Sequence, residues 1–410
     1  MTTFTKLKLK DVCLKISSGG TPSRKRSDYF DLNNGHLWVK SKELLEKGIT
    51  DTEEKISEIG LQNSSAKYYQ ANTILVAMYG VNAGQLAWLE RPATVNQAIC
   101  ALVVDDKKAD WKFIYYSLLE SRQGLISLAR GAAQPNLNKD MVENFETSIC
   151  ADLKIQTRIA SVLSSYDDLI ENNEKRIKAL EEMSQLLYTE WFVKFKFPGY
   201  EKVNMIDTGT QYGIIPENWN LTKIKKIGKV ITGKTPPTSN LENFNGEVLF
   251  VKTPDIHGNI FIIETEQTLS TFGVKTQSIK LLPEKTVMVS CIGTLGVVGI
   301  TSKPSQTNQQ INSLILNDPE DYCFFYLFAK SLKQRLVGLG SNGATMGNVN
   351  KDKFENIEIV YPEEKTRKLF TKKTSDLFDE ILLLQKNNKN LSKTRDLLIP
   401  QLVTGKRELK

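Results

Sequence analysis

The sequence predicts an α+β protein in which two similar β-rich lobes are joined by two long helices. A chain of 410 residues is too long for one ordinary hydrophobic core, so two or more domains are expected. The sequence also repeats itself at a distance of about 212 residues, and each copy is followed by a long helical pattern. We expect the two helices to form an antiparallel coiled coil and the chain to have approximate two-fold symmetry.

The internal repeat indicates which parts of the chain form each lobe. Its clearest segment, Gly131–Glu146 (GAAQPNLNKDMVENFE), aligns without a gap on Gly343–Glu358 (GATMGNVNKDKFENIE). Three shorter pairs recur in the same order: Ser18–Pro22 with Thr232–Pro236, Leu37–Ser41 with Leu249–Thr253, and Val95–Ile99 with Thr307–Ile311. We therefore expect one lobe in residues 1–150 and the other in residues 223–361.

Each lobe is predicted to mix strands and helices. The apolar runs Ile74–Met78 and Val287–Cys291 have the length of buried strands and lie among glycine-rich turns. The segments Trp111–Leu119 and Cys323–Leu336 are typical of helices. Short strands combined with one or two helices indicate an α+β lobe.

The segment after each lobe is predicted to be a long helix, in residues 151–192 and in residues 362–410, with a linker in residues 193–222. Apolar residues recur there at alternating spacings of three and four, which is typical of a coiled-coil seam. An amphipathic helix packed only on its own lobe is the alternative. The residues expected in the seam and at the interface with other subunits are Ile170, Asn173, Ile177, Leu180, Leu187, Ile381, Leu384, Asn388, Leu391 and Leu398.

The direction of the chain predicts how these helices pair. The first helix must run from lobe one to lobe two, and the second helix starts at lobe two, so paired helices are antiparallel. Asn173 and Asn388 then both lie near the middle of the coil. One buried polar residue at such a position commonly fixes the register of a coiled coil.

Composition indicates an ordinary soluble protein with an excess of positive charge. Its net charge of +7 and its isoelectric point of about 8.9 suit a polyanionic partner. The five cysteines are scattered, the N-terminus lacks the apolar core of a signal peptide, and the most apolar stretch, Val287–Ile300, is too short to cross a bilayer. We expect a cytoplasmic protein with reduced thiols and no membrane segment.

One segment matches a nucleotide-binding motif. Gly228–Thr235 (GKVITGKT) fits the P-loop pattern G-x-x-x-x-G-K-[ST], in which the last residue opens a phosphate-binding helix. Pro236 and Pro237 follow at once and disfavour that helix, so we interpret the match as a coincidence.

Other catalytic patterns are missing from the sequence. The two histidines, His36 and His257, have no ligand partner at i+3 or i+4, and the patterns [DN]-P-P-[FYW], G-x-S-x-G and H-E-x-x-H do not occur. Glu53–Lys55 has the form of a nuclease E-x-K motif, but we interpret it as a solvated charge run. The sequence therefore favours a binding function.

Polar and basic segments fit contacts with nucleic acid. The basic cluster Ser23–Arg26 lies beside a glycine-rich turn and can meet phosphates; an ordinary surface loop is the alternative. An Asn-Gln pair recurs in both lobes and can either read adenine edges or cap turns inside each lobe. The loops Gly131–Asn138 and Gly343–Asn350 can either approach a nucleic-acid backbone or fold against the coil. The residues expected to contact DNA are Thr21, Ser23, Arg24, Lys25, Arg26, Lys40, Asn96, Gln97, Asn136, Thr235, Lys252, Asn308, Gln309 and Asn348.

With the repeat and the helices in view, the chain resembles the specificity (S) subunits of type I restriction–modification systems over almost its whole length. The segments that carry the resemblance are Leu180–Gly199 (LEEMSQLLYTEWFVKFKFPG), Gly213–Trp219 (GIIPENW), Gly19–Pro22 (GGTP) and Leu398–Lys406 (LIPQLVTGK). Two departures are that Ala151–Gln156 lacks the Pro and Glu-Gln start often seen there, and that lobe one has no Pro-x-x-Trp lead-in.

The resemblance implies two target-recognition domains, each reading one half of a bipartite and asymmetric site in double-stranded DNA. It implies that the helices dock two modification subunits, which methylate adenines, and that two restriction subunits complete the complex. S-adenosylmethionine, ATP and Mg²⁺ are expected on those partners only, and this chain is expected to be non-catalytic and to hold no cofactor or metal. Two other classes stay open: an ATP-dependent enzyme that uses the Gly228 motif, and a stand-alone DNA-binding or scaffold protein.

Overall fold

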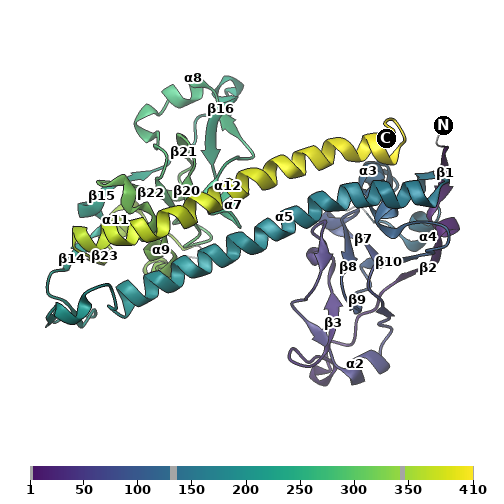
Figure 1. The fold of residues 1–410 in the computed structure, drawn as a ribbon, viewed down its shortest axis with the longest axis horizontal. Coiled ribbons are helices and arrows are strands. Elements are labelled where there is room, and N and C mark those ends of the chain that lie inside the picture. The colour runs from purple at the N-terminus through teal and green to yellow at the C-terminus, as the bar shows by residue number, and fades with distance from the viewer. Residues whose placement is uncertain (1–2, 130–135, 342–346, 410) are drawn as a thin grey trace. The chain divides into compact units, whose positions relative to one another are not determined.

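The computed structural model describes residues 3–129, 136–341 and 347–409. The chain divides into two compact units: unit 1 is Met1–Ile170 with Asn390–Lys410, and unit 2 is Glu171–Lys389. Both boundaries fall inside the two long helices, α5 (Leu153–Tyr188) and α12 (Glu364–Val403). Each unit therefore consists of one lobe and one end of each long helix, and Figure 1 shows the elements of both.

Lobe 1, in unit 1, contains two main sheets and a strand pair. The first sheet has the order β2 (Cys13–Ser18), β10 (Ile99–Val104), β7 (Ile74–Ala77), β8 (Leu86–Leu89) and β4 (Gly48–Ile49). The second sheet has the order β5 (Lys55–Ile56), β3 (His36–Val39), β9 (Ala93–Val95) and β6 (Tyr68–Tyr69). Strand β1 (Phe4–Lys8) pairs with β11 (Glu146–Cys150), and the helices are α1 (Leu9–Val12), α2 (Glu58–Gln62), α3 (Trp111–Ser127) and α4 (Lys139–Glu143).

Lobe 2, in unit 2, is built the same way. Its first sheet has the order β15 (Gly228–Thr232), β22 (Ile311–Leu316), β19 (Val287–Ser290), β20 (Val298–Thr301) and β17 (Phe261–Ile262). Its second sheet has the order β18 (Thr268–Leu269), β16 (Phe244–Val251) and β21 (Ser305–Thr307), and β14 (Asn220–Lys223) pairs with β23 (Glu358–Tyr361). The helices are α6 (Ile224–Ile227), α7 (Thr253–Ile256), α8 (Thr271–Lys275), α9 (Tyr322–Ser331), α10 (Lys333–Gly340) and α11 (Lys351–Glu355), and a hairpin of β12 (Met205–Asp207) and β13 (Ile214–Pro216) precedes the lobe.

The strand registers confirm the internal repeat. Trp38 lies opposite Thr94 across the parallel pair β3–β9, and Phe250 lies opposite Gln306 across the parallel pair β16–β21. The five-stranded sheets follow the same strand order in both lobes, with β2 matching β15 and β4 matching β17. Lobe 2 therefore repeats the strand order of the five-stranded sheet of lobe 1 and the register of this parallel strand pair.

The predicted strands and helices lie close to the expected bounds. Strands β7 and β19 each end one residue earlier than predicted, and helix α3 begins at the expected residue but continues to Ser127. The helix expected at Cys323–Leu336 is divided into α9 and α10 at Leu332, whose N–H donates to the carbonyl of Ala329 in a tight turn (3.1 Å). The local apolar pattern therefore predicts the elements better than their ends.

Each lobe has two hydrophobic cores because its five-stranded sheet is buried on both faces. Successive side chains of a strand point to opposite faces. In β7, Ile74 and Val76 belong to a core shared with the ends of α5 and α12, whereas Leu75 and Ala77 belong to a core between the two sheets. In β19, Val289 likewise belongs to a core shared with α5 and α12, and Met288 belongs to a core between the two sheets. This double burial explains why both strands read as continuous apolar runs.

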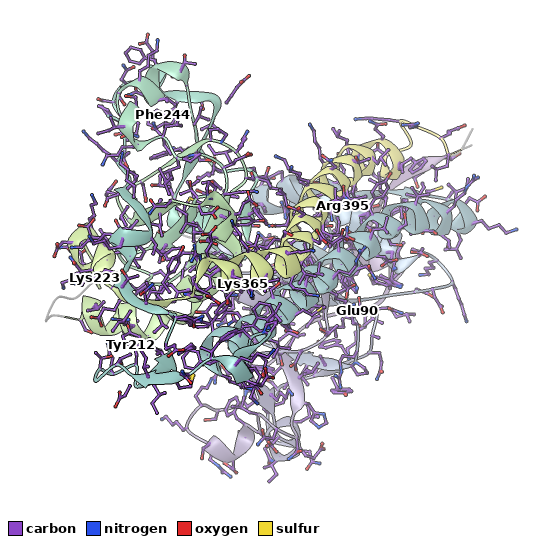
Figure 2. The ribbon with its side chains drawn as sticks, turned by 60° about the vertical axis from the view of Figure 1, so that its left-hand side comes forward. Glu90, Tyr212, Lys223, Phe244, Lys365 and Arg395 are labelled. Atoms are coloured by element: carbon purple, nitrogen blue, oxygen red, sulfur yellow. The ribbon has the colours of Figure 1, made fainter. Side chains whose placement is uncertain are left out.

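The two long helices pack against each other in antiparallel fashion, as predicted. In unit 2, Asn173 Nδ2 donates to Asn388 Oδ1 (2.7 Å), and Arg176 Nη2 lies 2.5 Å from Glu380 Oε1. In unit 1, Arg395, which is labelled on α12 in Figure 2, pairs with Asp167 of α5. As the residue number rises along α5 from Asn173 to Arg176, the number of the partner on α12 falls from Asn388 to Glu380, so the two helices run in opposite directions.

The residues predicted for the seam lie at this helix pair to different depths. Ile381, Leu384 and Asn173 are buried. Seven others are half-buried: Ile170, Ile177, Leu180, Leu187, Asn388, Leu391 and Leu398. The helices also contribute residues such as Leu163 and Phe378 to the lobe cores, so each end of the pair is packed both on its partner helix and on a lobe.

The P-loop match has no P-loop structure. Gly228–Thr232 is strand β15, which pairs with β22 in a regular antiparallel ladder. Lys234 N donates to Thr307 O (2.9 Å), and no helix opens at Thr235. The interpretation of this motif as a coincidence is confirmed for the described residues around it.

Candidate nucleic-acid interface

In each lobe most of the predicted DNA-contact residues lie at one edge of the second sheet. In lobe 1, strands β3 and β9 are parallel, so their carboxyl ends meet at the same edge. Asn96 N donates to Val39 O (2.9 Å), and Gly20 N donates to Val95 O (2.9 Å), which joins the loop after β2 to this edge. The surface formed here, the strand-end surface of lobe 1, carries Thr21, Ser23, Arg24, Lys25, Arg26, Lys40, Asn96 and Gln97.

Lobe 2 has an equivalent strand-end surface. Asn308 N donates to Val251 O (3.1 Å), and Lys234 N donates to Thr307 O (2.9 Å). These bonds repeat the two bonds of lobe 1 at matching positions. The surface carries Thr235, Lys252, Asn308 and Gln309.

The paired Asn and Gln residues have different surroundings. Asn96 Oδ1 accepts from Ala98 N (3.1 Å), and Asn308 Oδ1 accepts from Gln310 N (3.1 Å), so both asparagines cap their own turn. The next residues, Gln97 and Gln309, are exposed. Of the two alternatives, capping describes the asparagines. The glutamine side chains lie at the surface, and Gln309 Oε1 accepts a hydrogen bond from Thr235 Oγ1 (2.7 Å).

Arg24 is held on an aromatic floor beside a carboxylate. Its guanidinium carbon lies 4.7 Å from the ring centroid of Phe30 and 5.0 Å from that of Trp38, and Nη1 donates to Glu54. The Trp38 indole is buried and its Nε1 donates to Gly20 O (3.1 Å), so the floor is fixed to the backbone. The basic cluster is therefore more ordered at Arg24 than an ordinary surface loop.

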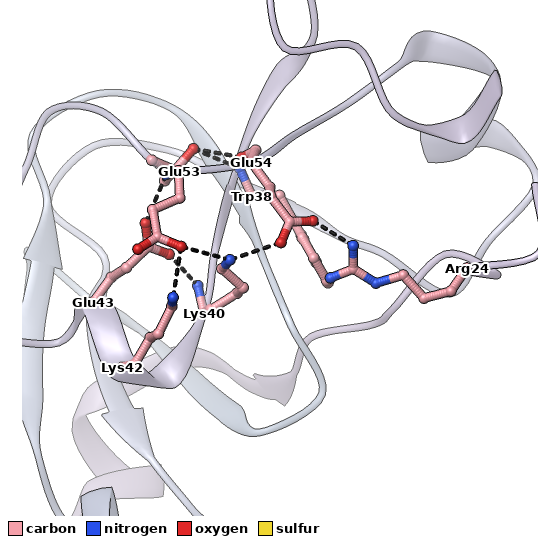
Figure 3. A network of polar contacts seen from close by, with 8 residues as sticks. Arg24, Trp38, Lys40, Lys42, Glu43, Glu53 and Glu54 are labelled. Carbon is pink, nitrogen blue, oxygen red and sulfur yellow. Dashed lines mark hydrogen bonds and ion pairs between the residues drawn. The ribbon is translucent and has the colours of Figure 1, made fainter. Parts of the chain in front are cut away.

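Figure 3 shows the polar network around Arg24. Lys40 Nζ donates to Glu54 Oε1 (2.7 Å) and to Glu53 Oε2 (2.9 Å), and Lys42 pairs with Glu53 (2.6 Å). Hydrogen bonds from Arg24 and then from Lys40 lower the pKa of Glu54 to about 2, so this carboxylate is ionised throughout the physiological range. The interpretation of Glu53–Lys55 as a solvated charge run is wrong for Glu54, whose side chain is 27% exposed and bound on two sides.

The same network is absent from the equivalent surface of lobe 2. Lys252 N donates to Asp255 Oδ2 (2.7 Å), as Lys40 N donates to Glu43, but no ion pair to the Lys252 ammonium occurs within the described part of the chain. Phe250 N donates to Gln267 O (3.3 Å) as Trp38 N donates to Glu54 O (3.2 Å), so Gln267 stands at the position of Glu54. Lobe 2 thus keeps the lysine and loses its carboxylate partner.

The other two cations of the cluster differ from Arg24. Arg26 donates through both Nε (2.8 Å) and Nη2 (2.7 Å) to the carboxylate of Asp28, and this bidentate pair raises the arginine pKa and lowers the aspartate pKa. Lys25 is exposed. One arginine of the loop therefore has its planar fork occupied by a neighbouring carboxylate.

The predicted glycine-rich loops lie largely outside the described residues, which exclude 130–135 and 342–346. Their last positions are described: Asn136 forms an isolated bridge with Tyr79, and Asn348 forms one with Ile292. Both asparagines are exposed.

Sequence reasoning missed the residues that position the cations. Glu54, Phe30 and Trp38 lie on separate segments and carry no motif, so only the fold brings them to Arg24. The repeat contained one usable signal, because Glu53-Glu54 aligns with Glu266-Gln267 and differs in one charge.

The described residues hold no arrangement for metal or thiol chemistry. No group of three or more His, Cys, Asp and Glu side chains is placed to bind a metal within residues 3–129, 136–341 and 347–409. Burial raises the pKa of Cys13, Cys100 and Cys323 to about 12 and that of Cys291 to about 11, so these thiols are protonated at neutral pH. Among the same residues, no helix is long and apolar enough to span a bilayer.

Comparisons with known proteins agree with this architecture. The family model described as "Type I restriction modification DNA specificity domain" matches residues 1–182 and 216–393. The chain is 32% identical over 337 residues to the "Type I restriction enzyme HindI specificity subunit" of Haemophilus influenzae, covering 68% of this chain and 73% of that protein. It is 26% identical over 411 residues to the "Type I restriction enzyme MjaIX specificity subunit" of Methanocaldococcus jannaschii, covering 97% and 92%.

A solved structure has the same fold. The crystal structure of a type I restriction–modification system S subunit from M. genitalium superimposes with a TM-score of 0.61 at 16% sequence identity, covering 100% of this chain and 97% of that chain. At this identity the likeness concerns the architecture of lobes and long helices.

Proposed function

Because this chain belongs to the type I restriction modification DNA specificity family, we propose that it reads a DNA target of two separate parts, one with each lobe. The chain is a non-catalytic specificity subunit. The observation that carries the proposal is that the two lobes share one framework but differ in the charged residues at their strand-end surfaces. Two readers with different surfaces predict an asymmetric target.

The strand-end surfaces and the adjoining loop ends are the proposed DNA-binding regions. They support binding because cations and exposed amides gather there on short loops, where phosphates and base edges are reached by side chains. The proposed contacts are Thr21, Ser23, Arg24, Lys25, Arg26, Lys40, Asn96, Gln97 and Asn136 in lobe 1, and Thr235, Lys252, Asn308, Gln309 and Asn348 in lobe 2. The capped asparagines Asn96 and Asn308 act through their turn backbone in this proposal.

The paired helices are the proposed docking region for the other subunits of the complex. Two modification subunits, which would use S-adenosylmethionine to methylate adenines, and two restriction subunits, which would use ATP and Mg²⁺, are the proposed partners. The match of this chain to the specificity family supports the proposal that the partners supply the chemistry.

A map of methylated adenines in the host, with and without this gene, tests the proposal. Deletion should abolish methylation at one bipartite motif. Exchanging Ile16 to Phe145 for the matching region of a relative should change one half of that motif and leave the other half unchanged, because that region contains most of lobe 1. Changes in both halves would show that the lobes do not read independently.

Enzymatic activity of the isolated chain is the contrary outcome. Methyl transfer from S-adenosylmethionine by the purified chain, free of partner subunits, would contradict the assignment of catalysis to the partners. Purification from the host without any modification subunit would favour a stand-alone DNA-binding or scaffold protein.

A further inference from the structure

We propose that Arg24 reads a guanine in the half-site of lobe 1, and that Glu54 and the rings of Phe30 and Trp38 hold it in position to do so. The inference rests on the proposed function, because it requires lobe 1 to read a half-site of its own. It goes further by naming one residue, one base and the groups that position the residue.

The Arg24 side chain is held in place by contacts within lobe 1. The guanidinium stacks over two rings at 4.7 and 5.0 Å, and one of its nitrogens, Nη1, is bound by Glu54. The rings are in edge contact, with centroids 6.0 Å apart. A side chain held this way before binding loses little freedom when it meets a base edge.

One edge of the Arg24 guanidinium is open to a ligand. Arg24 donates to Glu54 through Nη1, which leaves Nε and Nη2 available among the described residues, and its side chain is 54% exposed. A guanidinium recognises guanine through two parallel donors to O6 and N7. Arg26, in the same loop, uses both Nε and Nη2 on Asp28, so its fork is closed.

The charges around Arg24 favour a base edge over a phosphate as its ligand. The network in Figure 3 contains three cations, Arg24, Lys40 and Lys42, and three carboxylates, Glu43, Glu53 and Glu54, so its charges balance. A phosphate is attracted by net positive charge. A guanine edge is neutral and is recognised by correctly placed donors, which a balanced and rigid network supplies.

Lobe 2 has neither the arginine nor the carboxylate at the equivalent positions. Helical turns and backbone bonds match Tyr29 with Asn243, which places Thr238 at the position of Arg24, and Gln267 stands at the position of Glu54. Phe244 and Phe250 stand at the positions of Phe30 and Trp38. The arginine and the carboxylate are thus both replaced in lobe 2, whereas the two aromatic positions are kept. This is the pattern expected of a residue pair that determines specificity.

The test is a binding selection from a random-sequence DNA library, using the full-length chain assembled with its modification subunit. The exchange of Ile16 to Phe145 identifies which half-site belongs to lobe 1. The variants are Arg24→Ala, Arg24→Lys, Glu54→Gln and, as the matched arginine of the same loop, Arg26→Ala. Thermal unfolding verifies that each variant is folded.

We expect the lobe 1 half-site to contain a G·C pair that Arg24→Ala no longer selects, with a loss of about 5- to 150-fold in discrimination at that pair. Arg24→Lys should also lose it, because an ammonium has no planar fork. Glu54→Gln should weaken the preference by less than Arg24→Ala. Arg26→Ala removes a proposed contact whose fork is occupied by Asp28, so it should lower affinity for all sequences alike and keep the preference for that pair. The lobe 2 half-site should be unchanged throughout.

Two results would overturn the inference and keep the proposed function. Equal loss of affinity for all sequences in Arg24→Ala, with the salt slope reduced by about one, would make Arg24 a phosphate contact. Unchanged selection, or a lobe 1 half-site without a G·C pair, would leave the network a structural one. A wild-type complex that selects no two-part target would instead overturn the proposed function, and this inference with it.

Discussion

At the residue scale, two lysines in equivalent places have opposite electrostatic surroundings. Lys40 is bound by Glu53 and Glu54, whereas the Lys252 ammonium has no ion pair among the residues described. Attraction to phosphate depends on charge that neighbouring carboxylates do not cancel. We therefore expect Lys252 to be the stronger phosphate contact of the two, and Lys40 to contribute less to the attraction of DNA.

The carboxylate of Glu54 should make lobe 1 sensitive to acid. Arg24 and Lys40 hold its pKa at about 2 in the folded chain, whereas an unfolded glutamate titrates near about 4.3. The unfolded state binds the proton first as pH falls, so the stabilisation is fully present above about pH 5 and is lost toward pH 2. Glu54→Gln should lower stability by about 1 kcal/mol at pH 7 and by almost nothing near pH 2. Thermal unfolding of both proteins from pH 7 to pH 3 measures this, and a constant difference across that range would contradict it.

Replacing Lys234 should leave ATP chemistry untouched. Lys234 is exposed and its backbone N–H is bound to Thr307 O at a strand end, so no phosphate-binding helix surrounds it. We expect Lys234→Ala to leave ATP hydrolysis by the assembled complex within about twofold of wild type, a change of about 0.4 kcal/mol or less. Loss of hydrolysis with DNA binding preserved would restore the nucleotide-binding interpretation of Gly228–Thr235.

What the sequence predicts at this scale is the set of residues, and what it misses is their pairing. The repeat places Lys40 and Lys252 at equivalent positions, which the strand registers bear out. Lys40 and Glu54 are far apart in the sequence and meet only because the segment before β5 lies beside β3. The capping role of Asn96 likewise depends on the turn geometry after β9, which its residue type alone leaves open.

At the element scale, the Asn173–Asn388 pair forms a polar layer between α5 and α12. This layer distinguishes the pairing of α5 with α12 from the pairing of two α5 helices. The side-chain amide of Asn173 donates a hydrogen bond to the side-chain amide of Asn388. The repeat matches Asn388 with Ile177, so a similar coil made of two α5 helices from different chains would place Asn173 against Ile177. A buried amide without a partner is costly, and the Asn–Asn layer therefore favours the pairing within one chain.

Removing one member of this layer should destabilise the helix pair. Asn388→Ala leaves the buried Asn173 amide without its partner and should cost about 1–3 kcal/mol. Asn387→Ala, at the exposed neighbouring position, is the matched control and should change stability by less than about 0.5 kcal/mol. Chemical unfolding measures both, and light scattering shows whether Asn173→Leu with Asn388→Leu increases pairing between chains. Equal effects of the two alanine variants would show that the layer does not stabilise the coil.

The long helices were the most predictable elements and the sheets the least. A seam repeated over many turns is a local signal, and it predicted both helices. The order of lobes and helices along the chain then predicted that the helices pair antiparallel. The order of strands within each lobe depends on contacts between distant segments, such as β4 beside β8, and the two-residue strands carry too little pattern to be recognised. Their existence follows from the fold of the whole lobe.

At the scale of the whole molecule, both compact units are continuous with the same two helices. Unit 1 takes the beginning of α5 and the end of α12, and unit 2 takes the remainder of each. A change of length in one helix alone would break the register fixed by Asn173 and Asn388. A change in both helices by the same amount preserves the pairing within each unit, which makes helix length a variable that can be altered without rebuilding either lobe.

We expect this length to set the spacing between the two half-sites. Helix α5 has 36 residues, which corresponds to a length of about 54 Å. Successive major-groove faces on one side of a duplex repeat every 34–36 Å. Helices of this length can therefore serve two lobes that read major-groove faces one turn of DNA apart. Inserting one heptad into both helices, near Ile177 and Asn388, adds about 10 Å, or roughly three base pairs, and keeps the seam in phase because it repeats every seven residues. The half-site sequences should stay the same while the preferred spacer grows by a few base pairs, or activity should disappear if the partner subunits do not span the longer coil. Mapping methylated adenines measures the spacer, and a fully active complex with an unchanged spacer would show that the helices do not set it.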